Sequence, residues 1–531
     1  MKQGGLIGAY KYRAVILDPV HGFVPINEAE YTLLQTPFMR RLHNITQLGL
    51  TFLVYPGARH TRFEHSIGVM HLMSRFAEKI VSIIQEDEDL CSTITKTCSK
   101  RELRNFVQLS RLTGLLHDIG HLPFSHQMEI ALANVEVSGA LSFQWFKEFD
   151  GKVHEYYTMK FIRFISENLV KRRVKLQQLL QAVEDALFKD TKNHKPRKEV
   201  LDRLGLKEGS YYVVNQLISG TIDADRLDYV LRDSLHTGVV YGRVDIDRLI
   251  YALTVDMAEN KPHVMYDIRG LSALEDMFDS RIKMYKWLYL HHKNTSFYIA
   301  LTKILEGIIN NWHEIRQQIY PQIDDLDFYE FMNPSNVADL IGKSLISLDE
   351  HEFMQATKVL RVLGDSQERR WASSIMERRD LLPISIIKRF GDITLYTSRR
   401  PQEVIRQLSM SLEDDDKVSQ LENKFLREYS NHYLHRLEEN CGNKKSKARF
   451  IVSSMSIEKR ALKRDLKVKG ARILELSGVS SHVRGIHYSA SEPIVYVHAY
   501  SDDECEHLFI RNNVETIKEI VFQTIENVVL S

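Results

Sequence analysis

The chain has 531 residues, of which 44% are hydrophobic and 27% charged, the balance of an ordinary soluble globular protein. Lysine and arginine (71) nearly equal aspartate and glutamate (70), so no global field recruits nucleic acid or an anionic membrane. Proline (12) and glycine (25) are scarce, which excludes collagen-like and low-complexity chains.

Cysteine usage and hydropathy bear on the compartment. Four cysteines without a CxxC motif do not predict a disulfide framework, and they favour a reducing environment. Residues 1–15 lack the apolar stretch of a signal peptide, and no apolar run approaches the roughly 18 residues of a spanning helix. We therefore expect a cytoplasmic protein with no membrane segment.

In chain order, the first predicted elements are two short strands within residues 11–27, with a turn at Asp18-Pro19. From about residue 28 to 310 the pattern is mostly helical. The apolar spacing is clearest over 103–117, and we expect this helix to stop at Gly120. Polar residues 189–210 predict a surface excursion.

After about residue 385 strand and helix patterns alternate, which predicts a smaller α+β C-terminal lobe. The expected strands are 384–387, 449–452, 472–476 and 494–497, and the expected helices are 417–440 and 456–467. Residues 413–416 form an acidic run, which we interpret as a solvated loop. Eleven lysines and arginines lie between Lys444 and Arg472. They form either a solvated basic face or a surface for nucleotide phosphates or nucleic acid.

Histidine and aspartate gather in three separate segments, RFEHS, LLHDIGHLPFSH and TIDADRLDYVLRD. Neutral imidazole and carboxylate are the usual ligands of a divalent transition metal. Helical bundles build such metal sites from ligands that lie far apart in sequence. A lone His-Asp pair would be weak evidence, but the ordered set H…HD…D predicts a metal centre.

With these segments the sequence resembles the HD-domain phosphohydrolases, and more closely the deoxynucleoside triphosphate triphosphohydrolases of bacteria and vertebrates. Further matching segments follow in family order and cover most of residues 11–300: LDPVHGFV (17–24), TPFMRRLHNITQLG (36–49), YPGARHTRFEHSIGV (55–69) and DMFDSRIKMYKWLY (276–289). The resemblance implies a mainly α protein with an HD-domain helical bundle core. We expect an N-terminal strand and turn segment at 1–35, a catalytic core at 36–385 and the α+β lobe at 386–531.

The resemblance also implies the activity, which is metal-dependent hydrolysis of dNTPs to deoxynucleosides and tripolyphosphate. The implied metal ligands are His65, His117, Asp118 and Asp225. This ligand set suits Fe, Mn, Zn or Ni, with Mg on the substrate phosphates. The metal would lower the pKa of a bound water and polarise a phosphoryl oxygen.

Three further histidines match positions around the α-phosphate. His126 is the expected general acid, and Glu129 is expected to orient it. His121 and His154 would hold the phosphate as charge develops. The plain alternative for His154 is a surface position on a helix.

Other matched positions imply contacts with the sugar, the base and the triphosphate. Gln47 and Asp233 would bind the 3′-hydroxyl, and Tyr229 would leave no room for a 2′-hydroxyl. Asp228, beside them, is interpreted as a helix-surface charge. The full set of expected substrate residues is Gln47, Leu48, Arg62, Arg226, Tyr229, Asp233, Arg281, Tyr285 and Tyr289.

Regulation is expected from the resemblance too, in the form of a nucleotide activator bound to a homo-oligomer, a tetramer or a hexamer. Arg40 and His43 replace residues that bind guanine in vertebrate relatives, so we expect an activator other than GTP. We also expect no N-terminal SAM-like domain, because residues 1–12 leave no space for one. The candidate regulatory residues are Asp18, His21, Arg40, His43 and His291.

Two alternatives stay open. One is another HD hydrolase that acts on nucleoside monophosphates or cyclic dinucleotides. The other is a nucleotide-sensing or nucleic-acid-binding protein, for which the basic stretch 444–472 is the support.

Overall fold

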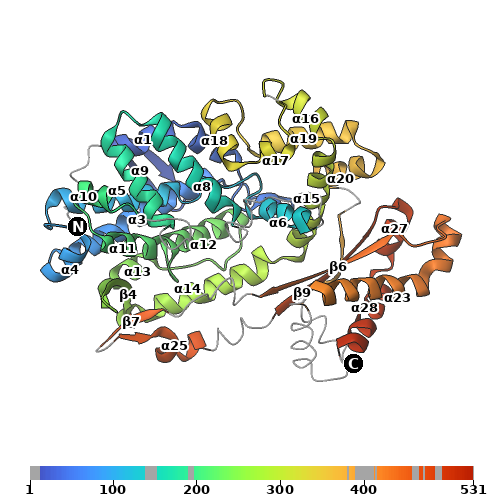
Figure 1. The fold of residues 1–531 in the computed structure, drawn as a ribbon. Helices are drawn as coiled ribbons and strands as arrows, with labels where there is room; N and C mark the ends of the chain where they lie inside the picture. Colours follow the sequence, from blue (N-terminus) through green and yellow to red (C-terminus); the bar gives the residue numbers. More distant parts are fainter. Residues whose placement is uncertain are drawn as a thin grey trace.

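The computed structural model describes residues 12–137, 152–188, 196–323, 325–378, 382–388, 412, 415–456, 466–470, 473–484 and 493–529. Across these residues the fold is mainly α-helical with three small sheets, so the expected fold class is confirmed (Figure 1). None of the described helices combines the length and the apolar character needed to cross a membrane.

The N-terminal strands form the predicted hairpin. β1 (Tyr12–Asp18) pairs antiparallel with β2 (Gly22–Asn27), and the last pair of the ladder is Asp18 opposite Gly22. The side chain of Asn27 caps α1 (Glu28–Leu34) by accepting hydrogen bonds from two backbone amides of its first turn. The hairpin is therefore joined directly to the helical core.

The core is built around two long helices, α3 (Arg62–Ile84) and α5 (Lys100–Leu116), which pack along each other. Their apolar residues, such as Phe76 and Leu112, are fully buried in one hydrophobic core. α5 is the helix predicted over 103–117, but it ends at Leu116 with His117 as its C-cap, before Gly120.

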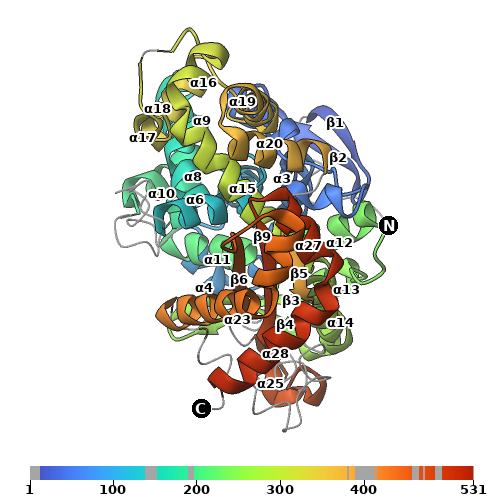
Figure 2. The same ribbon diagram turned by 90° about the vertical axis from the view of Figure 1, so that its right-hand side faces the viewer.

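Some of the remaining helices of this core pack against α3 and α5, and others, such as α16 and α19, lie to one side of them (Figures 1 and 2). They are α2 (Pro37–Arg40), α4 (Glu88–Ile94), α6 (His126–Val137), α8 (Val153–Phe164), α9 (Val174–Phe188), α10 (Lys198–Leu204), α11 (Glu208–Ser219), α12 (Ala224–Thr237), α13 (Ile246–Ala252), α14 (Leu271–Met284), α15 (His292–Asn310), α16 (Trp312–Ile319), α17 (Phe328–Phe331), α18 (Pro334–Gly342), α19 (Glu350–Leu363) and α20 (Ser366–Glu377). Short 3₁₀ and π turns join some of them, including the π turn Tyr285–Tyr289 after α14. The surface excursion expected at 189–210 is wrong for its described part, which forms α10 and the start of α11.

The C-terminal lobe has a sheet and a core of its own, at the lower right of Figure 1. Its antiparallel sheet has the order β5 (Ile384–Ile387), β9 (Pro493–Ser501), β6 (Ala448–Ser456). The helices α23 (Asp415–Cys441), α27 (Glu504–Asn512) and α28 (Val514–Val529) accompany it. Three of the predicted strands and the helix predicted at 417–440 are therefore confirmed. Residues 413 and 414 of the acidic run lie outside the described residues.

A third sheet joins residues 467–475 to the helical core. Its order is β3 (Leu253–Ala258), β4 (Lys261–Asp267), β7 (Lys467–Lys469), β8 (Ile473–Glu475). β7 pairs parallel with β4, with Val468 opposite Tyr266, and the short α25 (Leu476–Val479) follows β8. Most of the helix expected at 456–467 lies outside the described residues, and Lys467 itself is in a strand. The domain division stays a prediction.

The cysteines overturn one expectation. Cys91 is joined to Cys98, and Cys441 at the end of α23 is joined to Cys505 in α27. The second pair lies 64 residues apart in sequence, and tertiary packing brings it together. Cysteine usage thus no longer argues for a reducing compartment, and the cytoplasmic location stays a prediction without that support.

Candidate active site

The expected metal ligands come together where α3, α5 and α12 meet. His65 lies in the first turn of α3, His117 caps the end of α5, and Asp225 lies in the first turn of α12. The Nε2 atoms of His65 and His117 lie 3.1 Å and 3.7 Å from Oδ1 of Asp225. Asp118 Oδ1 is 3.4 Å from His117 Nε2. The four side chains thus face one point.

The protonation of both histidines suits a metal. Nδ1 of His117 donates to the carbonyl of Gly114 at 2.8 Å, and Nδ1 of His65 faces Oδ2 of Asp228 at 2.7 Å. Because each Nδ1 carries a proton, Nε2 is the nitrogen left to bind a cation, which is either a second proton or a metal ion. Both Nε2 atoms are buried and make no hydrogen bond within the described residues. Buried polar atoms of this kind are what a divalent cation would satisfy.

The electrostatics favour a positive charge at this point. Burial lowers the pKa of His65, but the carboxylates of Asp225 and Asp228 outweigh burial and raise that pKa to about 9. Burial alone would raise the pKa of Asp225, yet His117 and His65 hold it below its usual range. His117 and Arg62 hold the pKa of buried Asp118 well below its usual range in the same way. The carboxylates therefore stay ionised.

Asp228 is not the surface charge that the sequence suggested. It is fully buried, and it also bonds Nε2 of His21 at 2.7 Å and receives two hydrogen bonds from Arg232. A Cβ at Gly68 of α3 would lie 1.9 Å from Oδ1 of Asp228, so α12 can approach His65 only because position 68 is glycine. Asp228 is a supporting residue of the metal site.

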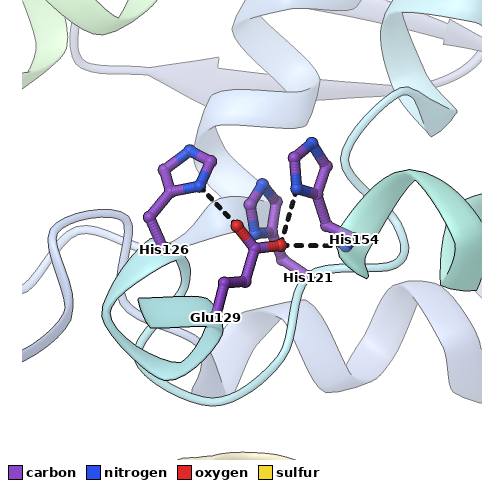
Figure 3. Close-up of side chains that lie close together, drawn as sticks. All are labelled: His121, His126, Glu129 and His154. Carbon is purple, nitrogen blue, oxygen red and sulfur yellow. Dashed lines mark hydrogen bonds and ion pairs between the residues drawn. The ribbon is translucent and has the colours of Figure 1, made fainter. Parts of the chain in front are cut away.

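A second cluster consists of His121, His126, Glu129 and His154 (Figure 3), and Nε2 of His121 lies 3.5 Å from Oδ1 of the expected metal ligand Asp118. Oε2 of Glu129 bonds Nδ1 of His126 at 2.9 Å, and Oε1 bonds both Nδ1 and the backbone N–H of His154, at 2.7 Å and 2.8 Å. The rings of His121 and His154 stack with centroids 4.3 Å apart. Glu129 therefore orients two histidines, where the sequence predicted one. His154 is not an isolated surface residue.

The charge states of these residues differ. Burial lowers the pKa of His154, but Glu129 outweighs it and raises the pKa to about 9. Burial and Arg62 lower the pKa of His121 well below its usual value. A cationic and a neutral imidazole thus lie stacked, with the more exposed His126 at the rim.

The backbone before α6 is strained where it delivers His126. Phe124 and Ser125 have positive φ angles of 59° and 56°, which residues other than glycine adopt at a cost. The hydroxyl of Ser125 donates to the carbonyl of Thr46 and accepts from Nε of Arg62 at 2.9 Å. These bonds hold the strained turn against the site.

One cavity of about 520 Å³ joins the two clusters to the predicted sugar side. Such a volume is typical of a small-molecule site. Oε1 of Gln47 is buried without a hydrogen bond among the described residues, and Asp233 bonds Tyr289 and His60, both at 2.7 Å. The expected residues that line this cavity are Gln47, Leu48, Arg62, Asp118, His121, His126, Glu129, His154, Asp225, Tyr229, Asp233, Tyr285 and Tyr289.

Two residues that were expected to contact the phosphates lie outside this cavity. Arg226 and Arg281 line an adjacent cavity of about 650 Å³, which shares Asp225 with the first. Arg226 forms an ion pair with Asp223, and the guanidinium of Arg281 lies 5.9 Å from the ring centroid of Tyr285. Both cations thus line a neighbouring cavity and not the one lined by the expected sugar contacts.

The five candidate regulatory residues lie outside the active-site cavity. Asp18 forms an ion pair with Arg232 at 2.9 Å, and His21 bonds Asp228. Both side chains are therefore buried beside the residues that hold the expected metal ligand His65. Exposed Arg40 donates to Gln35, and His43 stacks on Phe63 with centroids 3.7 Å apart. His291 caps α15.

Sequence reasoning missed two residues that position others. His60 is buried, holds Asp233, and stacks on His236 with centroids 4.5 Å apart. Asp228 holds His65. For both, the only sequence signal was their position inside a matched segment, because their partners lie 163 or more residues away.

Comparisons with known proteins agree with this geometry. Residues 62–231 match the HD domain family, and they contain the four expected metal ligands. An uncharacterized protein of Methanocaldococcus jannaschii is 31% identical over 324 residues, which are 60% of this chain and 55% of that protein. The uncharacterized protein YwfO of Bacillus subtilis is 33% identical over 300 residues, 56% of each chain.

A named relative and a solved structure extend the comparison. Deoxynucleoside triphosphate triphosphohydrolase SAMHD1 of Homo sapiens is 30% identical over 365 residues, which are 65% of this chain and 53% of that protein. The chain thus spans about half the length of these three relatives. A crystal structure described as a phosphohydrolase from Bacteroides thetaiotaomicron has a TM-score of 0.59 at 22% identity, covering 92% of this chain and 99% of that one. This last likeness concerns the fold.

Proposed function

We propose that this chain, which belongs to the HD-domain family over residues 62–231, is a metal-dependent phosphohydrolase that cleaves dNTPs to deoxynucleosides and tripolyphosphate. The observation that carries the proposal is the single cavity. Its lining includes two carboxylates of the expected metal ligands, Asp118 and Asp225, and the two histidines that bond Glu129. It also includes the expected sugar contacts Gln47, Tyr229 and Asp233. The similarity to a named dNTP triphosphohydrolase supports the choice of substrate.

His65, His117, Asp118 and Asp225 would hold the metal, with Fe, Mn, Zn or Ni as the expected ions and Mg on the substrate phosphates. When bound, the metal lowers the pKa of water and polarises a phosphoryl oxygen. Asp228 and the carbonyl of Gly114 keep the two ligand imidazoles in the required tautomer. Arg62 adds a positive charge beside Asp118.

The histidine cluster would act on the α-phosphate. The oxygen of a water molecule joins the α-phosphorus, and the bond from that phosphorus to the 5′-oxygen breaks. With Nδ1 of His126 bonded to Glu129, the opposite nitrogen is the one that donates a proton to the departing 5′-oxygen. The cationic His154 stabilises charge on the phosphate as it develops.

Recognition of the sugar would come from the opposite wall. Asp233 accepts a hydrogen bond from Tyr289 and bonds His60, so its carboxylate is oriented before a 3′-hydroxyl arrives. Gln47 is a second side chain expected at that hydroxyl, and its Oε1 makes no hydrogen bond among the described residues. Tyr229 would pack under the sugar and exclude a 2′-hydroxyl.

The experiment is product analysis in oxygen-18 water after the bound metal has been identified by elemental analysis. Each dNTP and NTP is tested, and the products are separated by chromatography. Label in tripolyphosphate together with unlabelled deoxynucleoside supports the proposal. Label in a nucleoside monophosphate, or full activity of chelated, metal-free protein, contradicts it.

Regulation is the second part of the proposal. We expect a homo-oligomer, a tetramer or a hexamer, whose activity responds to a nucleotide, as the resemblance to the dNTP triphosphohydrolases implies. Light scattering and activity are measured together while each NTP and dNTP is added in turn. A monomer with hyperbolic kinetics under every condition contradicts this part alone.

A further inference from the structure

A second hollow lies away from the active site, between the starts of α1 and α9 and the first half of α5. It encloses about 670 Å³, a volume within the range of small-molecule sites. Arg104, Arg173 and Lys175 line it together with the apolar side chains of Leu176 and Leu179. It shares no lining residue with the active-site cavity.

The rim of this hollow is part of a concentrated basic patch, which we call the α5–α9 patch. Two segments that lie about 70 residues apart supply its cations, and all of the cations are exposed. The chain as a whole has a net charge of only +1, so this patch is a local excess. The residues of the patch are Lys100, Arg101, Arg104, Lys171, Arg172, Arg173 and Lys175.

The cations occupy positions that helix formation does not favour. The N-terminus of a helix carries partial positive charge, so acidic side chains are stabilising there and basic ones are not. Yet Lys100 and Arg101 open α5, Lys175 lies in the first turn of α9, and that turn contains no acidic residue. Departures from a local rule of this kind concentrate at functional sites. A bound anion would remove the conflict at α9, whereas α5 already has Glu102 in its first turn.

Among the described residues, the acidic side chain beside Arg173 forms only weak ion pairs. Glu28 lies 4.0 Å from Arg173 and 3.8 Å from Arg13, and all three side chains are more than half exposed. The carboxylate of Glu102 accepts hydrogen bonds from Thr97 and Ser99. Burial, Arg101 and Arg104 together lower the pKa of Lys175, in keeping with repulsion between neighbouring cations.

We propose that the hollow bounded by the α5–α9 patch is a second nucleotide site. The patch would bind the phosphates through charge-assisted hydrogen bonds, for which arginine is suited. The apolar wall of Leu176 and Leu179 would pack against the base. A nucleotide is favoured over a nucleic-acid strand because the hollow is of small-molecule size and has this apolar wall. The site is independent of the proposed catalytic activity.

The test compares two charge-reversed full-length chains with the wild type. In the first, Arg104→Glu and Lys175→Glu act within the patch. In the control, Lys358→Glu and Lys424→Glu change the net charge equally on exposed lysines of α19 and α23. Equilibrium dialysis with ATP, in the presence of a chelator, counts the ATP bound per chain. Circular dichroism checks the fold, and Arg104→Gln with Lys175→Gln replaces the first variant if the reversed one does not fold.

We expect the patch variant to bind one ATP fewer per chain, or to bind at that site at least tenfold more weakly, while the control matches the wild type. Inorganic tripolyphosphate should compete with ATP but bind less tightly, because it has no base. Equal stoichiometry and affinity in the patch variant and the wild type overturn the proposal. So does binding of single-stranded oligonucleotides that tightens with length and that ATP does not displace, because this result assigns the patch to nucleic acid.

Discussion

Nδ1 of His65 lies 2.7 Å from Oδ2 of Asp228, which is a buried aspartate outside the expected ligand set. The second oxygen of the same carboxylate lies 2.7 Å from Nε2 of His21, on the turn between β1 and β2. One carboxylate thus links an N-terminal hairpin to a metal ligand. Supporting residues of this kind fix the tautomer and the orientation of the ligand.

Replacing Asp228 by asparagine should weaken metal retention by roughly 10–100-fold without removing it, because the four ligands stay in place. Metal content is measured after dialysis against graded chelator. The double variant His117→Ala, Asp118→Ala gives the reference for complete loss of metal. Asp276→Asn, at an exposed position of α14, is the matched control. Unchanged metal content in Asp228→Asn would show that the carboxylate has no role in holding the site.

His126→Ala should lower kcat by about 10²–10⁴-fold, the usual scale for a positioned acid or base, with little change in metal content. Glu129→Ala should lower kcat in the wild type and again in the His126→Ala background, because Glu129 also holds His154. In a chain that lacks both histidines, the same substitution should have little further effect. If Glu129→Ala lowered kcat in that chain by the same factor as in the wild type, Glu129 would not act through the two histidines.

The raised pKa of His154, about 9, predicts a pH-dependent stability. A histidine whose folded-state pKa exceeds its unfolded value of about 6.5 contributes its full stabilisation below pH 6.5. That contribution is lost as the pH rises through about 9, and it amounts to at most about 3 kcal/mol. Urea unfolding from pH 6 to 10 should show a steeper decline for the wild type than for His154→Gln. Parallel curves would contradict the assignment.

Tyr229→Ala should admit ribonucleotides, since it removes the ring expected to exclude a 2′-hydroxyl. The ratio of kcat/KM for dATP over ATP should fall roughly tenfold or more. Tyr289→Phe is the matched comparison, because it keeps a ring but removes the hydrogen bond to Asp233. It should raise KM for dATP and leave the ratio unchanged. A preserved ratio in Tyr229→Ala would place the discrimination elsewhere.

The sequence by itself predicted many of the elements and a candidate ligand set. Apolar spacing predicted α5 to within a few residues, and alternation predicted β5 at its observed bounds, because both depend on local periodicity. The order of His65, His117, Asp118 and Asp225 predicted a metal centre, since these residue types in this sequence order are rarely assembled for another purpose. Tyr285 and Tyr289, both expected at the substrate, do lie together, with ring centroids 5.1 Å apart.

Only the tertiary structure decided which groups support those ligands and which side chains bond the same carboxylate. Asp228 had the appearance of a surface charge until the packing of α12 against Gly68 buried it beside His65. Glu129 serves two histidines because the start of α8 brings His154 to it, 25 residues away. The pairing of Cys441 with Cys505, and of β4 with β7, depends on similar long-range packing. Periodicity and motif spacing report local geometry, whereas these contacts arise from burial of surfaces that are distant in sequence.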